Sequence, residues 1–459
     1  MKRRRPVLLT ALLLLLAPAA PRAAAPALSE AAGWLQQYLR INTTNPPGNE
    51  RAAAAFLAGI LQREGIASRI VATPEGRANL WARLPSPRSG GKALLLLHHM
   101  DVVAAGPGWS EQPFAGMVKG GYLWGRGALD DKSLGIAQLA ALIDLKRRKA
   151  PLDRDLIYLA VADEENGGVR GTAWLLANHP ELFQGVEGVI GEGGRSQTGA
   201  GGKLLWWGIE VAQKRPLWLD VSTSGRGGHG AGLNPDSANH QLIQGLARLI
   251  AAPLKWRVTP PVRAYCKAIA PLQNERWKRV FSNIDAVIAP EGPKEFLLPG
   301  MANLFLDTVQ VTVLRGGDRI NVIPERASAQ LDVRLLPDTD AAAFLADVKK
   351  RLGPDFEVKV RVTSPPSAPS PASGRLYGAI ERALRPDGPV TPTFIAGFTD
   401  SRYFREKGIP AYGVTPFKIG PEDSKGIHGP DERIPLAELD RGVERMRRMV
   451  SFYATPPGR

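Results

Sequence analysis

The stretch that decides the fold is residues 94–132, LLLLHHMDVVAAGPGWSEQPFAGMVKGGYLWGRGALDDK. Its four consecutive leucines are too few for a helix and too apolar for an exposed edge, which predicts a buried parallel strand. The strand leads into the triplet His99-Met100-Asp101, and Asp130-Asp131-Lys132 later opens a predicted helix. An imidazole and carboxylates at strand ends suit a metal site in the crevice of an open α/β sheet.

Strands and helices alternate on both sides of this stretch. Strands are predicted at residues 79–84, 93–97, 156–162 and 188–191, and helices at 28–39, 51–64, 134–146 and 171–178. This order predicts an α/β domain with a mostly parallel sheet wrapped by helices. A helix at 376–384 and a strand at 409–414 are expected to complete the same domain.

The pattern changes at Leu217 and predicts a second domain inserted in the first. Strand, helix, strand, strand, helix and strand follow at 217–222, 237–251, 305–314, 327–336, 341–352 and 356–362. This β-α-β-β-α-β order fits a ferredoxin-like α+β domain. A compact domain rarely carries a structureless loop as long as residues 253–302, so helices are predicted there. The expected division is a signal peptide at 1–25, a catalytic domain at 26–213 and 365–459, and an inserted lid or dimerisation domain at 214–364.

The N-terminus predicts export. A basic segment at 2–5, an apolar segment at 7–16 and small residues at 23–25 form the pattern of a cleaved secretory signal, too short to span a membrane. We therefore expect a periplasmic or secreted protein without a stable membrane anchor. The chain carries a net charge of +15, but no nucleic-acid motif accompanies it, so no nucleic-acid partner is expected. Cys266 is the single cysteine, which excludes an intrachain disulfide.

The six histidines lie in different surroundings. His179 and His240 stand among polar residues of predicted helices, which is typical of surface positions. His98 points to the opposite strand face from His99, which favours a packing role. The remaining three, His99, His229 and His428, lie in distinctive glycine-rich or acidic motifs and are the candidate functional histidines.

Carboxylates follow the predicted buried strands and are themselves followed by glycines. Glu164 and Glu165 end one strand, Glu192 follows the next, and Asp130 precedes a helix. A helix cap would explain Asp130 alone, and a solvated strand end would explain the adjacent pair Glu164 and Glu165. Neither explains the recurrence of carboxylates at several sheet ends, which favours a metal site.

An ordered set of motifs resembles a known family. HMD (99–101), GRGALDDK (125–132), DEENGG (163–168), GEGG (191–194), GGHG (227–230), NVIP (321–324) and IHGPDER (427–433) look like the dinuclear zinc peptidases. That family includes glutamate carboxypeptidase, aminoacylase, acetylornithine deacetylase and succinyl-diaminopimelate desuccinylase. The likeness covers essentially the whole chain after the predicted signal peptide.

The resemblance implies two Zn²⁺ per subunit, for which Co²⁺ can substitute. Asp130 would bridge the two ions, with His99 and Glu192 on one and Glu165 and His428 on the other.

It also assigns residues around these ligands. Glu164 would be the general base, since consecutive residues at a strand end point differently and leave one carboxylate for the metal and one for water. Asp101 would accept the other ring N–H of His99 and fix its tautomer. Asp131 has no such assignment and is interpreted as a helix cap.

The inserted domain resembles the family's lid and dimerisation domain, which implies a homodimer. His229 would reach across the dimer and stabilise the oxyanion of the tetrahedral intermediate. Asn321, Arg334 and Gly397 would contact the substrate, Arg334 through its free carboxylate. Where many relatives have Gly-Gly-Thr-Asp this chain has a phenylalanine, Phe398, which hints at a larger or more apolar substrate.

The sequence therefore predicts a zinc-dependent hydrolase that cleaves the amide bond of a short peptide next to a free carboxylate. The alternative within the same mechanism is an aminoacylase-like hydrolase of N-acyl amino acids. Two noncatalytic alternatives are a periplasmic binding protein on a degenerate peptidase fold and a basic cell-envelope adhesion module. The presence of all five metal positions and of Glu164 favours the enzyme.

Overall fold

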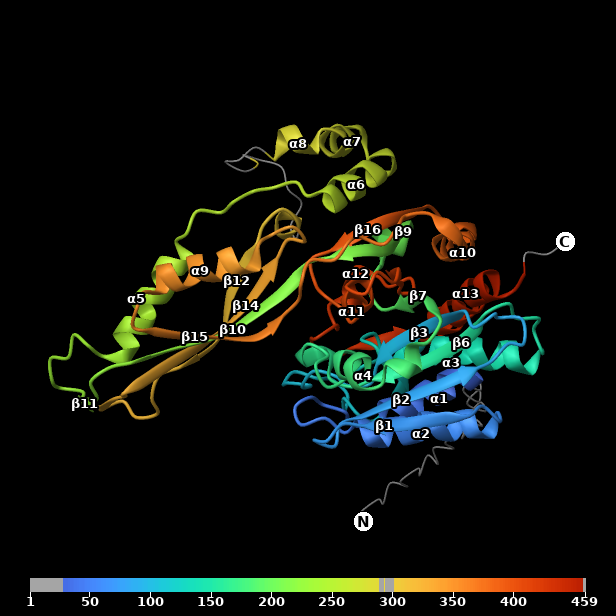
Figure 1. Ribbon diagram of the computed structural model, residues 1–459, viewed down its shortest axis with the longest axis horizontal. Helices are drawn as coiled ribbons and strands as arrows, with labels where there is room; N and C mark the ends of the chain where they lie inside the picture. Colours follow the sequence, from blue (N-terminus) through green and yellow to red (C-terminus); the bar gives the residue numbers. More distant parts are fainter. Residues whose placement is uncertain (1–27, 289–292, 294–300, 457–459) are drawn as a thin grey trace, which may run out of the picture.

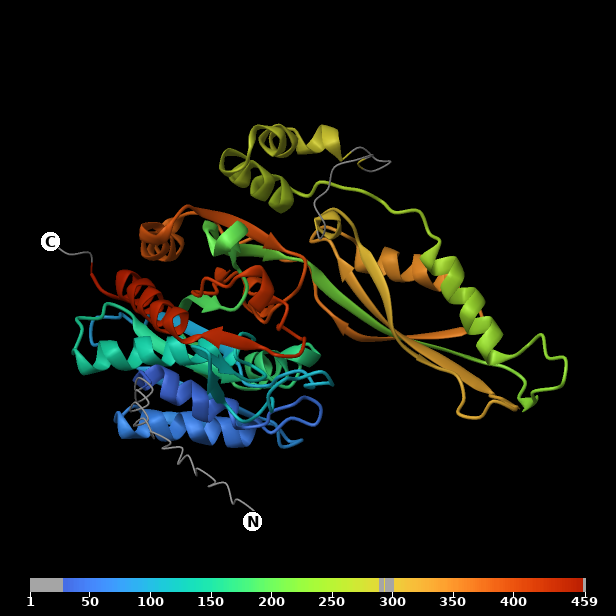
Figure 2. The ribbon, with the colours of Figure 1, turned by 180° about the vertical axis from the view of Figure 1, so that it is seen from behind.

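The computed structural model describes residues 28–288, 293 and 301–456, arranged as a large domain and an elongated smaller one (Figures 1 and 2). The predicted signal peptide at 1–25 lies outside the described residues. Among the helices of the described part, none combines the length and the apolar character that crossing a membrane requires.

The large domain is built on a nine-stranded sheet in the order β1-β2-β6-β3-β7-β17-β9-β16, with β8 paired to β9. Its centre, β6-β3-β7-β17, is parallel, as predicted. At one end β1 and β2 pair antiparallel, and at the other end β9 pairs antiparallel with β17 and β8 and parallel with β16. The strands are β1 Ser68–Ala72, β2 Ala78–Leu84, β3 Ala93–His99, β6 Asp155–Val161, β7 Val186–Gly191, β8 Ser196–Thr198, β9 Leu204–Gln213, β16 Val390–Ile395 and β17 Ala411–Gly413.

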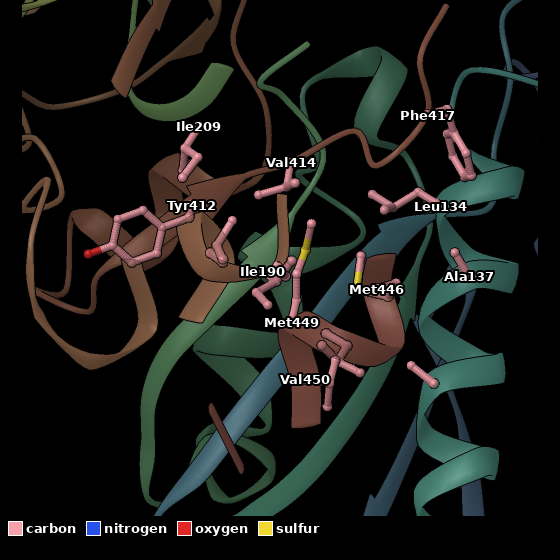
Figure 3. Packing of buried hydrophobic residues seen from close by; sticks show 14 of the residues in the cluster. Leu134, Ala137, Ile190, Ile209, Tyr412, Val414, Phe417, Met446, Met449 and Val450 are labelled. Atoms are coloured by element: carbon pink, nitrogen blue, oxygen red, sulfur yellow. The ribbon is translucent and has the colours of Figure 1, made fainter. Parts of the chain in front are cut away.

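Helices cover both faces of this sheet, which explains the continuous leucine run of β3. Leu94 and Leu96 pack into the larger core, while Leu95 and Leu97 pack into a second core on the opposite face. Figure 3 shows part of the larger core. The larger core contains α1 Glu30–Leu39, α2 Glu50–Arg63, α3 Lys132–Arg147, α10 Gly374–Leu384 and α13 Leu436–Ala454, and the second core contains α4 Thr172–Asn178 and α11 Ser401–Arg405.

The smaller domain has the predicted ferredoxin-like topology. Its antiparallel sheet has the order β12-β14-β10-β15, the order expected when two β-α-β units of this kind interleave. Helices α5 and α9 pack on one face of the sheet. The elements are β10 Arg215–Ser224, α5 Ala238–Ile250, β12 Thr308–Arg315, β14 Arg326–Leu335, α9 Ala341–Leu352 and β15 Phe356–Thr363, with a short ribbon of β11 Gly228–His229 and β13 Val322–Ile323 at the tip.

The helices predicted within residues 253–302 exist, but they do not belong to the smaller domain. They are α6 Pro260–Ile269, α7 Glu275–Ser282 and α8 Ile284–Val287. Val262, Cys266 and Ile269 form one apolar face of α6 and are buried in the large-domain core, where α6 lies against β16. The helix face of the small sheet is already covered by α5 and α9, so the prediction of one continuous inserted domain from 214 to 364 needs this correction.

Candidate metal centre and active site

The predicted site lies where the central parallel strands end. His99 is the last residue of β3, Glu164 and Glu165 follow β6, and Glu192 directly follows β7. Because the carboxyl ends of parallel strands meet at one edge of a sheet, these side chains converge. Asp130 joins them from the segment before α3, and His428 from the segment before β18 Arg433–Pro435.

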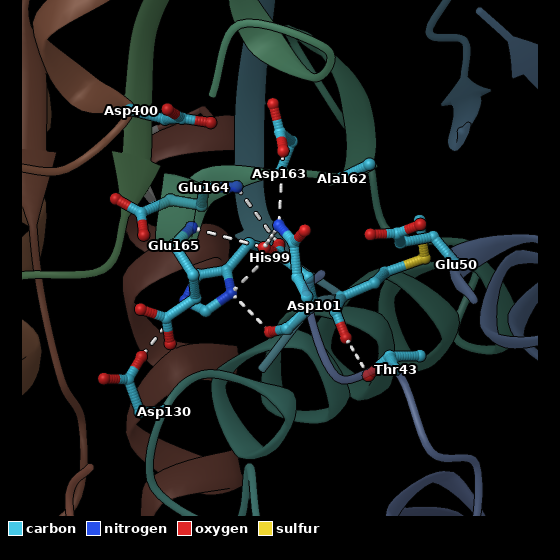
Figure 4. A network of polar contacts seen from close by, with 12 residues as sticks. Thr43, Glu50, His99, Asp101, Asp130, Ala162, Asp163, Glu164, Glu165 and Asp400 are labelled. Atoms are coloured by element: carbon cyan, nitrogen blue, oxygen red, sulfur yellow. Dashed lines mark hydrogen bonds and ion pairs between the residues drawn. The ribbon is translucent and has the colours of Figure 1, made fainter. Parts of the chain in front are cut away.

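The structure brings all five predicted ligand residues together. The His99 Nε2 atom lies 3.0 Å from Asp130 Oδ1 and 3.7 Å from Glu192 Oε2. The His428 Nε2 atom lies 3.3 Å from Asp130 Oδ2 and 3.3 Å from Glu165 Oε2. Asp130 thus presents one carboxylate oxygen to each histidine, which is the placement that a bridging ligand requires. Figure 4 shows His99, Asp130 and Glu165 from close by.

The donor set fits divalent cations. Two groups, His99 with Asp130 and Glu165, and His99 with Asp131 and Glu192, have ligand atoms within 4.8 Å of one another. Within the described part of the chain, Glu165 Oε1 and Asp131 Oδ2 are buried without a hydrogen-bond partner. Leaving a buried carboxylate oxygen without a partner costs free energy, and bound cations, one at each group, would provide a partner for each of these two oxygens. Imidazole nitrogen and carboxylate oxygen are ligands that Zn²⁺ accepts.

Asp131 therefore differs from its prediction as a helix cap. It occupies the N-cap position of α3, but its side chain accepts no N–H from the helix. It lies with His99 and Glu192 instead.

The electrostatics of the cluster favour bound positive charge. Hydrogen bonds with Asp130 and Glu165 raise the pKa of His428 to about 10. Burial, followed by the charge of Asp130, raises the pKa of Glu165 to about 7. Burial opposes protonation of His99, but the charge of Glu192 and hydrogen bonds with Asp101 and Asp130 outweigh it and raise its pKa. The raised pKa values mean that, without a metal ion, the clustered carboxylates favour protonation of His99, Glu165 and His428. A bound divalent cation would supply the positive charge instead and displace these protons.

Asp101 contacts the His99 ring with both its main-chain carbonyl and its carboxylate, the carbonyl being the nearer. The His99 Nδ1 atom lies 2.9 Å from the Asp101 carbonyl oxygen and 3.6 Å from the nearer carboxylate oxygen. The carboxylate accepts the main-chain N–H groups of Glu164, at 3.1 Å, and Glu165, at 3.2 Å. Asp101 thus also holds the turn that carries the predicted base, a role beyond the one the resemblance implies.

Asn45, Glu50 and Arg77, three polar residues that the sequence pattern does not single out, form a hydrogen-bond network that holds this turn through Asp163 and Asp101. Asp163 has the left-handed φ of 71°, and its carboxylate accepts from Arg77 Nη1 at 3.1 Å and Asn45 Nδ2 at 3.2 Å. The Arg77 Nε atom also donates to Glu50 at 2.8 Å, and the Asn45 amide donates to Asp101 at 2.7 Å. These residues come from the first 77 positions, far in sequence from the turn, so no local pattern marks them.

Glu164 faces a small cavity that it lines with His99, Glu192 and Asp400. Burial, followed by the negative charge of Glu192, raises the pKa of the Glu164 carboxyl well above its ordinary value. Burial also raises the pKa of Asp400 to about 6. A carboxyl with a raised pKa beside a candidate metal centre has the properties of a general acid–base group.

His229 and Asn321 lie together but away from this cluster. His229 belongs to β11, and the Gly230 N–H donates to the Asn321 carbonyl oxygen at 2.9 Å. Both residues are exposed, and β11 lies at the tip of the smaller domain that points away from the large domain (Figure 1). Within one protomer, the structure does not bring them to the metal ligands.

Arg334 lies at the junction of the two domains and is already paired. Its guanidinium donates to both carboxylate oxygens of Asp332, at 2.6 and 2.9 Å. It also lies 4.4 Å from the centroid of the Phe398 ring, and the Arg402 guanidinium lies 4.6 Å from the same centroid. Gly397 is exposed beside Phe398. Phe398, the residue that departs from the family pattern, thus contacts one arginine of each domain.

The other three histidines behave as predicted. His98 is buried and packs against Tyr158, with 5.2 Å between ring centroids. His179 pairs with Glu181 at 3.1 Å near the surface, and His240 is exposed on α5.

Comparisons with known proteins agree with this geometry. The family model described as Peptidase family M20/M25/M40 matches residues 95–451. Human aminoacylase-1 is 28% identical over 92% of this chain and 95% of its own length. A succinyl-diaminopimelate desuccinylase of Methylobacterium sp. (strain 4-46) is 30% identical over 92% and 96%, respectively. Among solved structures, an M20 family metallo-carboxypeptidase from Sulfolobus solfataricus superposes with a TM-score of 0.70 at 20% identity, over 93% of this chain and 99% of that chain. Human carnosine dipeptidase 1 gives 0.69 at 17% identity, over 92% and 96%.

Proposed function

The chain belongs to peptidase family M20/M25/M40, and from this premise we propose that it is a dinuclear zinc hydrolase that releases an amino acid from an amide-linked substrate. The observation that carries the proposal is the convergence of His99, Asp130, Glu165, Glu192 and His428 beside Glu164. The family consists of hydrolases of amide bonds, so neither the binding-protein nor the adhesion alternative gains support from it.

The proposed mechanism assigns each residue a task. When bound, zinc ions would ionise a water and polarise the scissile carbonyl. Glu164 would take the proton from that water and deliver it to the nitrogen of the leaving amine. The hydrogen bonds from the Glu164 and Glu165 main chain to Asp101 would keep the base and the neighbouring ligand in register.

We propose that the substrate carboxylate binds at the junction of the two domains. Arg334 would contact it through the guanidinium edge that does not face Asp332, with Gly397 as a further contact. Asn321, which lies beside His229 at the tip of the smaller domain, would reach the substrate only from the partner protomer. These assignments rest on the motif resemblance and on the position of Arg334 between the domains.

The proposal has two forms, which differ in the group on the carbonyl side of the cleaved amide bond. Carboxypeptidase or dipeptidase action would require a peptide, whereas aminoacylase-like action would require an N-acyl amino acid. The two curated relatives described above are named as an aminoacylase and a desuccinylase, which favours the N-acyl form.

Hydrolysis of acetyl-amino acids and of matching dipeptides, each with and without a metal chelator, tests the proposal. We expect chelator-sensitive release of free amino acid, faster from the acetylated substrate. Absence of hydrolysis of both substrate types by zinc-loaded protein would contradict the proposed function.

We further propose that the protein is a homodimer in which the smaller domain supplies His229 to the partner's metal centre. The exposed tip position of His229 supports this, because it leaves the histidine without a catalytic partner in its own chain. Large apolar side chains are also exposed on and near the smaller domain, namely Leu233, Ile243, Ile250, Leu254, Leu314, Ile320 and Val322.

Mixing two inactive variants, His229→Ala and Glu164→Gln, tests this arrangement. Mixed dimers contain one site in which both residues are intact, so activity should reappear on subunit exchange. A mixture that stays inactive although mixed dimers form would show that His229 does not act across the dimer.

We propose a periplasmic or secreted location, on the basis of the signal-like residues 1–25. N-terminal sequencing of the mature protein from fractionated cells should find a start near residue 26. A cytoplasmic protein with an intact N-terminus would contradict this location.

A further inference from the structure

Glu432 is a fully buried carboxylate that takes no part in the mechanism proposed above. Its two oxygens accept four hydrogen bonds: from the main-chain N–H of Gly127 at 2.9 Å, Leu129 at 2.7 Å and Asp130 at 3.0 Å, and from Arg126 Nη1 at 2.7 Å. The carboxylate therefore fixes the backbone of Asp130, the predicted bridging ligand, from a position only four residues after His428.

Arg126 completes the connection from the other side. Its Nη1 and Nη2 atoms donate to the carbonyl oxygens of Gly426, at 3.3 Å, and Gly429, at 2.8 Å. These glycines lie on either side of His428. Arg126 is 1% exposed, and its guanidinium lies 5.1 Å from the Trp109 ring. The segment carrying Asp130 and the segment carrying His428 are thus tied together at several points by one buried ion pair.

This arrangement needs a carboxylate rather than any polar group. All four partners of Glu432 are N–H donors, and both oxygens of a carboxylate accept. In a glutamine the NH₂ group would replace one oxygen and would face donors that it cannot bond. Likewise, a planar guanidinium can donate to the carboxylate and to two carbonyl groups at once, which a lysine ammonium cannot do with the same geometry.

We propose that Arg126 and Glu432 are positioning residues that set the distance between Asp130 and His428 and thereby the affinity for the metal ion these two residues share. The proposal rests on the dinuclear metal function proposed above. The 3.3 Å separation of His428 Nε2 and Asp130 Oδ2 depends on how the two segments are held together. The pairing of β5 Tyr122–Trp124 with β18 and the hydrogen bond from the Gly125 N–H to the Glu432 carbonyl oxygen, at 2.9 Å, align the backbones, and the side chains of Arg126 and Glu432 extend this alignment to Asp130 and to both sides of His428. Loss of residues that orient metal ligands typically lowers metal affinity by about 10- to 100-fold.

Zinc titration of the metal-free full-length protein against a chromophoric chelator measures this effect. For Glu432→Gln we expect one of two zinc ions to bind about 10- to 100-fold more weakly, while the other stays closer to wild type. The visible spectrum of the Co²⁺-loaded variant should change as well, because the spectrum reports the ligand geometry around the ion.

Asp155→Asn is the matched control. Asp155 is also a buried carboxylate that accepts from an arginine, Arg83 Nε at 2.7 Å, and from a main-chain N–H, that of Ser86 at 2.7 Å. It lies at the opposite end of β6 from the metal site. We expect it to lower the melting temperature without changing zinc affinity, which separates positioning from general stability.

Arg126→Lys decides the question if Glu432→Gln does not fold. It keeps the positive charge beside Glu432 but loses the simultaneous contacts to Gly426 and Gly429, so the same selective weakening is expected. Wild-type zinc affinity in a folded variant, or losses equal to those of Asp155→Asn, would overturn the inference. Wild-type protein that binds no zinc would instead contradict the proposed function itself.

Discussion

Replacing Arg77 with methionine tests how the turn that carries Glu164 is held. Arg77 joins two buried carboxylates: its side chain is 9% exposed, and the side chains of Glu50 and Asp163 are 1% and 0% exposed. Arg77→Met would leave Glu50 without this cation in a buried site and would remove one of the donors to Asp163. Breaking a buried ion pair by removing one partner costs about 3–5 kcal/mol, a large part of the roughly 5–15 kcal/mol that stabilises a typical domain.

The assay is urea unfolding followed by far-ultraviolet circular dichroism, with turnover measured on the folded variant. We expect a loss of about 3–5 kcal/mol in the free energy of unfolding. We also expect about a tenfold or larger fall in kcat, because Asp163 loses one of the donors that fix the turn before Glu164.

Arg263→Met is the control, since Arg263 forms a similar two-pronged pair with Asp285, at 2.6 and 2.8 Å, but both side chains are about half exposed. It should leave the unfolding midpoint unchanged. Equal effects of the two variants would refute the argument that burial makes the Arg77 network important.

Three further predictions concern other parts of the molecule. Burial raises the pKa of the Cys266 thiol to about 12, so a thiol reagent at pH 8 should label no cysteine in the folded protein and one after unfolding in urea; rapid labelling of the native protein would contradict this packing. Phe398→Ala removes the ring between Arg334 and Arg402, and because each such contact contributes about 0.5–2 kcal/mol, KM for an acetyl-amino acid should rise about two- to thirtyfold with a smaller change in kcat. An unchanged KM would remove Phe398 from substrate binding. Dialysis against a chelator should abolish hydrolysis, and added Zn²⁺ or Co²⁺ should restore it; full activity after removal of metal would argue against a metal enzyme.

The centre of the fold is predictable from the sequence because it is encoded locally, whereas the set of five candidate ligands comes from the motif resemblance. A run such as 94–97 can only be a strand covered on both faces, and the structure places Leu94 and Leu95 in different cores. Three of the five candidate ligands, His99, Glu165 and Glu192, lie at or just after strand ends, and parallel strands bring these ends together whatever lies between them. Residues such as His99 and Glu192 therefore meet without any knowledge of loop conformation. Asp130 and His428 instead come from the segments before α3 and β18.

Features that depend on contacts between distant segments are not predictable in this way. That α6 packs on the large domain depends on which apolar surface is left uncovered by α5 and α9. That the Asp101 carboxylate also accepts the main-chain N–H groups of Glu164 and Glu165 depends on rotamer and backbone, which residue types do not encode. The helix α13 is not among the predicted elements, although Leu439, Val443, Met446 and Val450 recur in it at helical spacing.

The most direct test of the account measures zinc content and turnover of wild type and Glu164→Gln together, with Glu275→Gln as an exposed control. We expect two zinc ions per chain in all three proteins and a fall in kcat of about 10²- to 10⁴-fold in Glu164→Gln alone. Near-normal turnover by Glu164→Gln, or active wild-type protein without bound metal, would contradict the central claim that Glu164 serves as the base of a dinuclear zinc centre.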